Sequence, residues 1–323
     1  MNQYLCPESG KKGQNMIKIE HLTKYYGQNP AVNDISFTVG EGEVVGFLGP
    51  NGAGKSTTMN MLTGYLSSTS GKCEIDGIDI LENPSEAKKL IGFLPEQPPL
   101  YYDMTTREYL NFIYDLKRCK LNRKEHIDEI VSVMGLEEME KRLIGQLSKG
   151  FKQRVGIAGA LVSNPGILIF DEPTIGLDPR QIIEIRDLIR TLSKDHTIIL
   201  STHILPEVQA VCDRIIIIDR GKLIADEKTD NINSLADENR RFTLRILAQK
   251  GEALTFLRKT EGAAKVEYLS SAKDGSSLFM IQCKKGYDLR RALFYALAEK
   301  RWPILELSPV GASLEDIFIA LTK

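Results

Sequence analysis

The stretch Gly49-Pro50-Asn51-Gly52-Ala53-Gly54-Lys55-Ser56 decides the fold of this 323-residue chain. It fits the pattern G-x-x-x-x-G-K-[ST], and it lies between an apolar run at 44–48 and a helical pattern at 57–66. Glycines let successive backbone N–H groups point at anionic oxygens, and the N-terminus of a helix adds a partial positive charge. The stretch therefore predicts a phosphate-binding loop between a strand and a helix, and a chance glycine-rich turn explains it poorly.

Three side chains of this loop have predicted roles on a nucleoside triphosphate with Mg²⁺. Lys55 places a point charge on the β- and γ-phosphates, Ser56 offers a hydroxyl to Mg²⁺, and Thr57 reaches the α-phosphate. The residues expected to hold the nucleotide here are Gly49, Pro50, Asn51, Gly52, Ala53, Gly54, Lys55, Ser56 and Thr57.

A second apolar run ends in two carboxylates, in Ile167-Leu168-Ile169-Phe170-Asp171-Glu172. Asp171 at the strand end is expected to hold Mg²⁺ opposite Ser56, and Glu172 to orient and deprotonate an attacking water. Adjacent carboxylates beside phosphates repel one another unless a divalent cation is present. A solvated acidic turn would explain the pair alone, but it explains the pair less well in a chain that also has a phosphate loop.

The pattern between residues 16 and 225 predicts an α/β core with a largely parallel sheet. Short apolar runs such as 44–48, 167–170, 197–200 and 215–218 alternate with helical patterns, as in strands covered on both faces. Between about 101 and 149 the pattern is helical throughout, which indicates a helical subdomain. Thr105 and Glu108 form a T-x-x-E capping box there.

The rest of the chain predicts a lead, a linker and a second domain. Residues 1–15 read as a disordered lead, so Met16 is an alternative to Met1 as the native start. The first domain is expected over 16–227, a charged linker over 228–240 and a small α+β domain over 241–323. The order of patterns in that last domain, strand-helix-strand-strand-helix-strand, is ferredoxin-like, and a final helix is expected from Ser313, capped by Ser313 and Asp316.

Composition excludes several classes of protein. Hydrophobic residues make up 42% and charged residues 26%, which is typical of a soluble globular chain, and the formal net charge of −1 argues against nucleic acid as a partner. No apolar run reaches the roughly 18–20 residues that span a bilayer, and residues 1–15 lack the apolar core of a signal peptide. The five scattered cysteines suit a reduced cytoplasmic protein without a zinc site.

Further motifs, in a fixed order, make the chain resemble the ATP-binding cassette (ABC) ATPases, the nucleotide-binding subunits of ABC transporters. Leu147-Ser148-Lys149-Gly150-Phe151-Lys152-Gln153 is similar to the LSGGQ signature of that family. Gly176-Leu177-Asp178-Pro179 resembles its D-loop, and Ser201-Thr202-His203 its switch-histidine loop. Tyr26 resembles the aromatic residue that stacks on adenine. The resemblance covers about two-thirds of the chain, roughly 16–225, and implies the ABC form of the P-loop fold.

Two positions depart from the family pattern. Lys149 stands where the common signature has a glycine, and this puts in doubt how tightly the signature backbone approaches phosphate. The glutamine position of the family's Q-loop falls by spacing on Glu96, with Gln97 one residue later. Either side chain offers an oxygen to Mg²⁺ and to the attacking water, so both remain candidates, with Glu96 favoured.

The resemblance implies a mechanism shared between two cassettes. One chain would supply the phosphate loop, both carboxylates and His203, which bonds the γ-phosphate. The opposite chain would supply Ser148 and Gly150 to the same ATP, and the D-loop with Asp178 also belongs to the nucleotide site. Whether the second cassette is a copy of this chain or a different protein stays open.

The resemblance also implies what the ATPase drives. We expect an energy-coupling subunit that lies on the cytoplasmic face of the cell membrane and binds a separate polytopic permease. The segment 91–110 and the C-terminal domain resemble the exporter-type branch of multidrug, sodium and gliding-motility ATPases, so export is favoured over import. The alternatives are a soluble ABC ATPase acting on ribosomes or DNA, and a scaffold with an inactive site. The single cassette, the lack of sustained heptads, and the presence of Lys55, Asp171, Glu172 and His203 argue against them.

Overall fold

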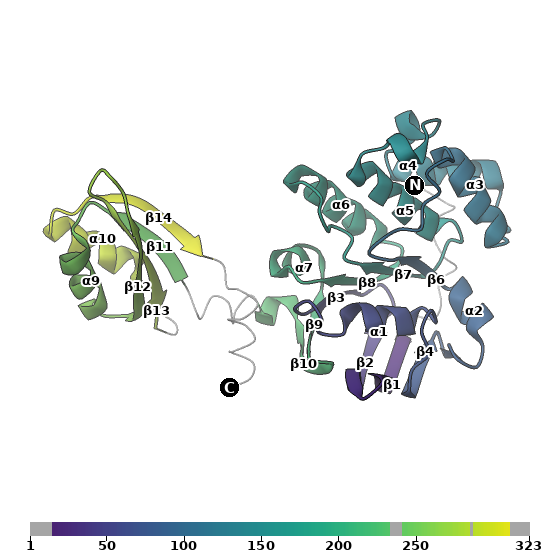
Figure 1. Cartoon of the computed structure of the whole chain (residues 1–323), viewed down its shortest axis with the longest axis horizontal. Coiled ribbons are helices and arrows are strands. Elements are labelled where there is room, and N and C mark those ends of the chain that lie inside the picture. Colours follow the sequence, from purple (N-terminus) through teal and green to yellow (C-terminus); the bar gives the residue numbers. More distant parts are fainter. Residues whose placement is uncertain (1–14, 233–240, 285–286, 311–323) are drawn as a thin grey trace. The chain divides into compact units, whose positions relative to one another are not determined.

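The computed structural model describes residues 15–232, 241–284 and 287–310, and the chain divides into two compact units, Met1–Thr229 and Asp230–Lys323 (Figure 1). The lead expected before Met16 lies almost wholly outside the described residues. The helix expected from Ser313, with its cap, lies outside them altogether.

A six-stranded sheet forms the centre of the first unit, in the order β10-β9-β3-β8-β7-β6. Neighbouring strands are parallel except for β10 and β9, which are antiparallel. All residues of β3, β7 and β8 are buried, as their continuous apolar runs predict. The strands are β3 (Val44–Leu48), β6 (Ile91–Leu94), β7 (Ile167–Asp171), β8 (Thr197–Thr202), β9 (Arg214–Asp219) and β10 (Lys222–Lys228).

A second, antiparallel sheet shares its core with the first. Its order is β2-β1-β4-β5, with β1 (Asn15–Tyr26), β2 (Asn29–Gly40), β4 (Ser70–Ile75) and β5 (Ile78–Asp79). The rings of Phe37 on β2 and Phe47 on β3 have centroids 5.7 Å apart, and Met59 of helix α1 belongs to the same buried cluster. The phosphate loop therefore leaves β3 and enters α1 within one packed core.

The helices of the first unit are α1 (Lys55–Leu62), α2 (Pro84–Lys89), α3 (Thr106–Leu116), α4 (Arg123–Val133), α5 (Lys149–Leu161), α6 (Pro179–Leu192) and α7 (Leu205–Val211), with 3-10 turns at Glu137–Met139 and Ile144–Gln146. The predicted helical subdomain contains α3, α4 and both 3-10 turns. The Thr105 side chain accepts a hydrogen bond from the Glu108 amide, and the Glu108 carboxylate accepts one from the Thr105 amide, which confirms the capping box. Helix α1 ends earlier than its pattern predicts, because Gly64 takes a left-handed conformation with φ of +62°.

The second unit has the predicted ferredoxin-like order of elements. They are β11 (Arg241–Ile246), α9 (Lys250–Lys259), β12 (Ala263–Ser271), β13 (Ser277–Cys283), α10 (Leu289–Glu299) and β14 (Ile304–Val310). The sheet is antiparallel in the order β12-β13-β11-β14, and Phe242, Phe279 and Leu293 lie in its core with both helices.

The start of the predicted linker is regular structure. Strand β10 runs to Lys228, residues 229–232 are helical, and Thr229 and Ile232 are buried. The predicted linker was based on the charged residues of this segment, but its less polar side chains are buried in the structure. The remainder of that stretch, 233–240, lies outside the described residues.

Candidate active site

The phosphate loop needs glycine at positions where other chain segments approach closely. A Cβ at Gly49 would lie 2.2 Å from the carbonyl oxygen of Ile218 on β9. Gly54, just before α1, has φ of +109°, and a Cβ there would lie 2.5 Å from the carbonyl oxygen of Ala31. The loop is therefore held tightly against its neighbours, with the N-terminus of α1 facing the site.

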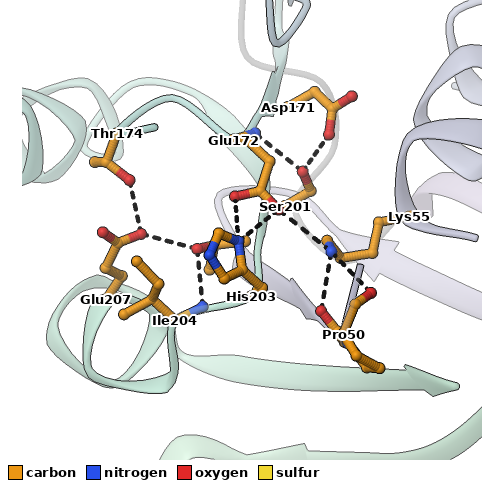
Figure 2. A network of polar contacts seen from close by, with 11 residues as sticks. Pro50, Lys55, Asp171, Glu172, Thr174, Ser201, His203, Ile204 and Glu207 are labelled. Carbon is orange, nitrogen blue, oxygen red and sulfur yellow. Dashed lines mark hydrogen bonds and ion pairs between the residues drawn. The ribbon is translucent and has the colours of Figure 1, made fainter. Parts of the chain in front are cut away.

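Lys55 lies folded against the loop from which it comes (Figure 2). Its Nζ donates to the carbonyl oxygens of Gly49 at 2.9 Å and Pro50 at 3.2 Å, and it lies 3.3 Å from Oε1 of Glu172. Lys55 is only 6% exposed, and a buried charge needs partners. The three oxygen atoms named above supply them. The ammonium group of Lys55 therefore already lies at the loop where a triphosphate would bind.

The ends of β7 and β8 hold Asp171 and Glu172 in place. The Ser201 hydroxyl donates to Oδ1 of Asp171, and the Glu172 amide donates to the carbonyl oxygen of Ser201 at 3.1 Å. The backbone of Glu172 has φ of +49°, a conformation that is uncommon for a residue other than glycine. Such backbone conformations are frequent at functional sites, and here the residue directs its carboxylate toward both Lys55 and His203.

The carboxylate of Glu172 lies between a lysine and a histidine (Figure 2). Nδ1 of His203 lies 2.9 Å from Oε2 and 3.1 Å from Oε1 of Glu172, so it shares Oε1 with Lys55. The Glu172 side chain is 7% exposed and the His203 side chain 37%. A buried carboxylate flanked in this way has its oxygens held in place and can take a proton from a water between it and a phosphate.

A cavity of about 330 Å³ opens at the loop. It is lined by Ala31, Asn51, Gly52, Gly54, Lys55, Ser56, Thr57, Glu96, Glu172 and Ile175. The structure thus brings Glu96 to the phosphate loop, whereas Gln97, Asp171 and His203 do not line the cavity. Ala31 and Ile175 were not predicted, because small and aliphatic side chains carry no chemical signal in a sequence.

The oxygen donors around this cavity fit Mg²⁺. Ser56 and Glu96 line it, and Asp171 lies at the end of β7, which pairs with β6, the strand before Glu96. Among the described residues, no three His, Cys, Asp or Glu side chains lie close enough together to hold a metal by themselves. Mg²⁺ is commonly bound by one or two protein oxygens together with substrate phosphates, so a partial protein site of this kind suits it.

The cavity is also not lined by Tyr26, Asp178, Ser148 or Gly150. Tyr26 ends β1, is 53% exposed, and has Nζ of Lys24 5.6 Å from its ring centroid. Asp178 caps α6 by accepting from the amides of Arg180 and Gln181 at 3.0 Å each. Ser148 caps α5, and with Gly150 it lines a separate small cavity of about 30 Å³. Within one chain the signature residues therefore do not reach the phosphate loop.

One buried carboxylate beside the site had no signal in the sequence. Glu207 in the first turn of α7 is 2% exposed and accepts hydrogen bonds from the hydroxyls of Thr174 and Thr202. Proline and glutamate are both common in the first turn of a helix, glutamate because it interacts favourably with the helix dipole. The sequence position of Glu207 therefore gave no sign of a special role.

Comparison with known proteins agrees with this geometry. Residues 32–175 match the family model for ABC transporters. The chain is 36% identical over 308 residues to the bacitracin transport ATP-binding protein BcrA of Bacillus licheniformis, covering 95% of this chain and 97% of that protein. It is 35% identical to the uncharacterized ABC transporter ATP-binding protein YhcH of Bacillus subtilis, covering 96% of each.

Solved structures give the same result. The dimeric structure of MJ0796, a bacterial ABC transporter cassette, superposes with a TM-score of 0.61 at 31% identity, covering 66% of this chain and 99% of that one. A post-hydrolysis dimer of the same cassette, bound to ADP and phosphate, gives a TM-score of 0.60 at 30% identity, with the same coverage of 66% and 99%.

The fold and the loop-carboxylate site define a P-loop ATPase of the cassette type. The chain belongs to the family of ABC transporter ATP-binding proteins. It binds and hydrolyses ATP as the subunit that powers a membrane transporter. In the described part of the chain, every helix is too short or too polar to cross a membrane.

Proposed function

We propose that this chain drives the export of an antimicrobial compound through a separate polytopic permease. The match to the bacitracin transport protein spans 95% of the chain and so includes the second unit as well as the cassette. Further relatives are named for linearmycin resistance in Bacillus subtilis, at 38% identity, and for lantibiotic transport in Streptococcus pyogenes, at 37% identity. Together these names favour export over import.

The observation that carries the catalytic assignment is the Glu172 carboxylate held between Lys55 and His203. Lys55 binds the β- and γ-phosphates, and Glu172 takes the proton from the attacking water. His203 holds the orientation of Glu172 and bonds the γ-phosphate. Gly49, Pro50, Asn51, Gly52, Ala53, Gly54, Ser56 and Thr57 cradle the phosphates, while Tyr26 stacks on the base.

Mg²⁺ would be held by Ser56, Asp171 and Glu96, with Gln97 as the alternative to Glu96. When bound, the ion neutralises charge on the phosphates. Because Glu96 lines the cavity and Gln97 does not, the structure favours Glu96.

The second half of the ATP site comes from another cassette. Ser148 and Gly150 stand at the N-terminus of α5, a position suited to a phosphate, yet they lie apart from the phosphate loop of their own chain. We assign them, together with Asp178, to the ATP held by the opposite subunit. Cassettes of this family form dimers, as the MJ0796 structure does.

The contact with the permease would lie after Glu96. Tyr101 and Tyr102 are 47% and 58% exposed, and they precede α3. Exposed aromatic side chains suit a helix laid into a groove. The chain would then lie on the inner face of the membrane without entering it.

A pull-down from detergent-solubilised cells tests this proposal. Tagged Glu172→Gln with Mg²⁺ and ATP should bind nucleotide, hydrolyse it at least 10²-fold more slowly, within the range of general-base effects, and retain a polytopic membrane protein. Glu137→Gln, a change at an exposed carboxylate of the first 3-10 turn, is the control and should hydrolyse ATP normally.

Two results would contradict the proposal. Ribosomal proteins or DNA in the eluate would favour the soluble alternative and leave the ATPase assignment intact. Unchanged hydrolysis by Glu172→Gln would remove the proton-accepting role of Glu172. Export itself is tested by growth in bacitracin, linearmycin or a lantibiotic, because loss of the gene should sensitise cells to at least one of them.

A further inference from the structure

Glu207 is a buried carboxyl group that the proposed chemistry does not use (Figure 2). Its Oε2 accepts from Oγ1 of Thr174 at 2.8 Å and from Oγ1 of Thr202 at 2.9 Å. Its Oε1 is buried and has no hydrogen-bond partner among the described residues. Burying a carboxylate is costly unless it is well bonded, so retaining one with a single bonded oxygen calls for a reason beyond packing.

The two hydroxyls belong to the segments that carry the candidate catalytic residues. Thr174 lies two residues after Glu172, where the chain leaves β7. Thr202 is the last residue of β8 and immediately precedes His203, and its hydroxyl also accepts from the Ile204 amide at 3.1 Å. Glu207 therefore links the segment that follows β7 to the last residue of β8.

Glu172 directly follows β7 and His203 directly follows β8, so their contact depends on how these two strand ends are held. The strands themselves are joined at Asp171 and Ser201, which lie close to these ends. Beyond that point Glu207 bridges Thr174 and Thr202. This bridge lies on the side of the Glu172–His203 contact away from Asp171 (Figure 2). The 2.9 Å separation of Nδ1 and Oε2 is thus fixed from both sides.

We propose that Glu207 is a positioning residue for ATP hydrolysis, acting through Thr174 and Thr202 to keep Glu172 and His203 aligned. This inference rests on the proposed roles of Glu172 and His203. A catalytic group displaced by about 1 Å can lose about 10²-fold in rate, so a bridge that does not touch ATP has a measurable effect on turnover. It should have little effect on ATP affinity, because neither threonine nor Glu207 lines the nucleotide cavity.

The test removes each hydroxyl with little change in shape. Thr202→Val and Thr174→Val in the full-length chain should each lower kcat at least tenfold, while the KM for ATP changes less than twofold. Thr202→Ser, which restores the hydroxyl, should recover most of the kcat. Thr197→Val is the matched control: Thr197 lies at the other end of β8, is 2% exposed, and accepts from the Gly42 amide at 2.8 Å.

A double-variant cycle shows whether the hydroxyl acts through Glu207. In a Glu207→Leu background, which has already lost the acceptor, adding Thr202→Val should change kcat less than twofold. All variants are assayed well below their melting temperatures, so that loss of folded protein does not enter the comparison.

Three results would overturn the inference. They are a kcat for Thr202→Val equal to that of Thr197→Val, a rise in KM at unchanged kcat, or full additivity with Glu207→Leu. Glu172→Gln is measured in the same assay, because its retained activity would instead overturn the proposed catalytic base. The two failures are therefore distinguishable.

Discussion

Lys55 and Glu172 form a buried ion pair, with Nζ 3.3 Å from Oε1 and side chains that are 6% and 7% exposed. The residue that would bind the γ-phosphate thus also contacts the residue that would activate water. An incoming triphosphate competes with the carboxylate for the lysine. Glu172 would be released from Lys55 as the phosphate is bound, while His203 continues to hold it.

Replacing Lys55 by Ala should weaken ATP binding and leave Glu172 without its cation. A hydrogen bond to a charged group contributes about 1.5–3 kcal/mol, which corresponds to a loss of affinity of roughly 10- to 150-fold measured by calorimetry. Removing one partner of a buried pair also costs about 3–5 kcal/mol of stability. The double variant Lys55→Ala/Glu172→Gln removes the uncompensated charge and should recover part of that loss in urea unfolding. A double variant no more stable than Lys55→Ala would contradict the importance of this pair.

Glu96→Ala should impair Mg²⁺-dependent hydrolysis more than Gln97→Ala does. Glu96 lines the cavity with Ser56, and Gln97 does not. We expect kcat to fall about tenfold for Glu96→Ala, with a higher Mg²⁺ concentration needed for half-maximal rate, and to change less than twofold for Gln97→Ala. Titrating Mg²⁺ at saturating ATP measures both effects. A larger effect at Gln97 would assign the metal contact to that residue.

A chain that ends at Thr229 should fold and bind ATP. Thr229 belongs to the first unit, because its amide donates to Asp213 O at 3.0 Å and its hydroxyl donates to Cys212 O at 2.6 Å. We expect the ATP affinity to stay within about twofold of the full chain, since the phosphate loop and both carboxylates are retained. A chain that ends at Gly221 is the control, because it lacks β10 and exposes the edge of β9. Equal behaviour of the two truncations, or unfolding of the longer one, would contradict the proposed domain boundary.

The free energy of unfolding should rise with pH in alkaline solution because of the buried Lys117. Its Nζ donates to Gly159 O and Ala160 O at 3.3 Å each, at the C-terminal end of α5, and burial lowers the pKa of Lys117 to about 8. Between about pH 8 and the usual lysine pKa of 10.5 the unfolded chain binds the extra proton, so the free energy of unfolding increases as pH rises.

Lys117→Met isolates this effect. Relative to that variant, the wild type should gain on the order of 1 kcal/mol between pH 8 and pH 10 in urea unfolding. Lys120→Met, at an exposed lysine, is the control and should run parallel to the wild type. Parallel curves for Lys117→Met as well would show that Lys117 does not titrate in this range.

The sequence predicted the parts of the site that are contiguous in the chain. The phosphate loop and the strand ending in Asp171 and Glu172 were identifiable because buried parallel strands have continuous apolar runs and chemical residues follow them. The spacing that favoured Glu96 agrees with its place in the cavity. Strand β10 and the helical segment after it were less apparent, because packing rather than charge determines their structure.

Other features depend on contacts that no local pattern encodes. Glu207 meets Thr174 through a separation of 33 residues, and its burial follows only from the packing of α7. Tyr26, expected from the family resemblance to stack on adenine, ends β1 and does not line the cavity. Ser148 and Gly150 line a different cavity, as expected of residues whose proposed ligand belongs to a second subunit.

The order of strands in the central sheet has a consequence for biosynthesis. Strand β3, which leads into the phosphate loop, pairs with β8 and β9 on its two sides. A nascent chain cannot complete these ladders until Asp219 at the end of β9 has left the ribosome, although the loop itself emerged some 160 residues earlier. Such long-range pairing is slow to form and leaves edges exposed meanwhile. In the cell, nucleotide would therefore bind to this loop only late in translation. It would stabilise a nearly complete cassette and would not nucleate its folding.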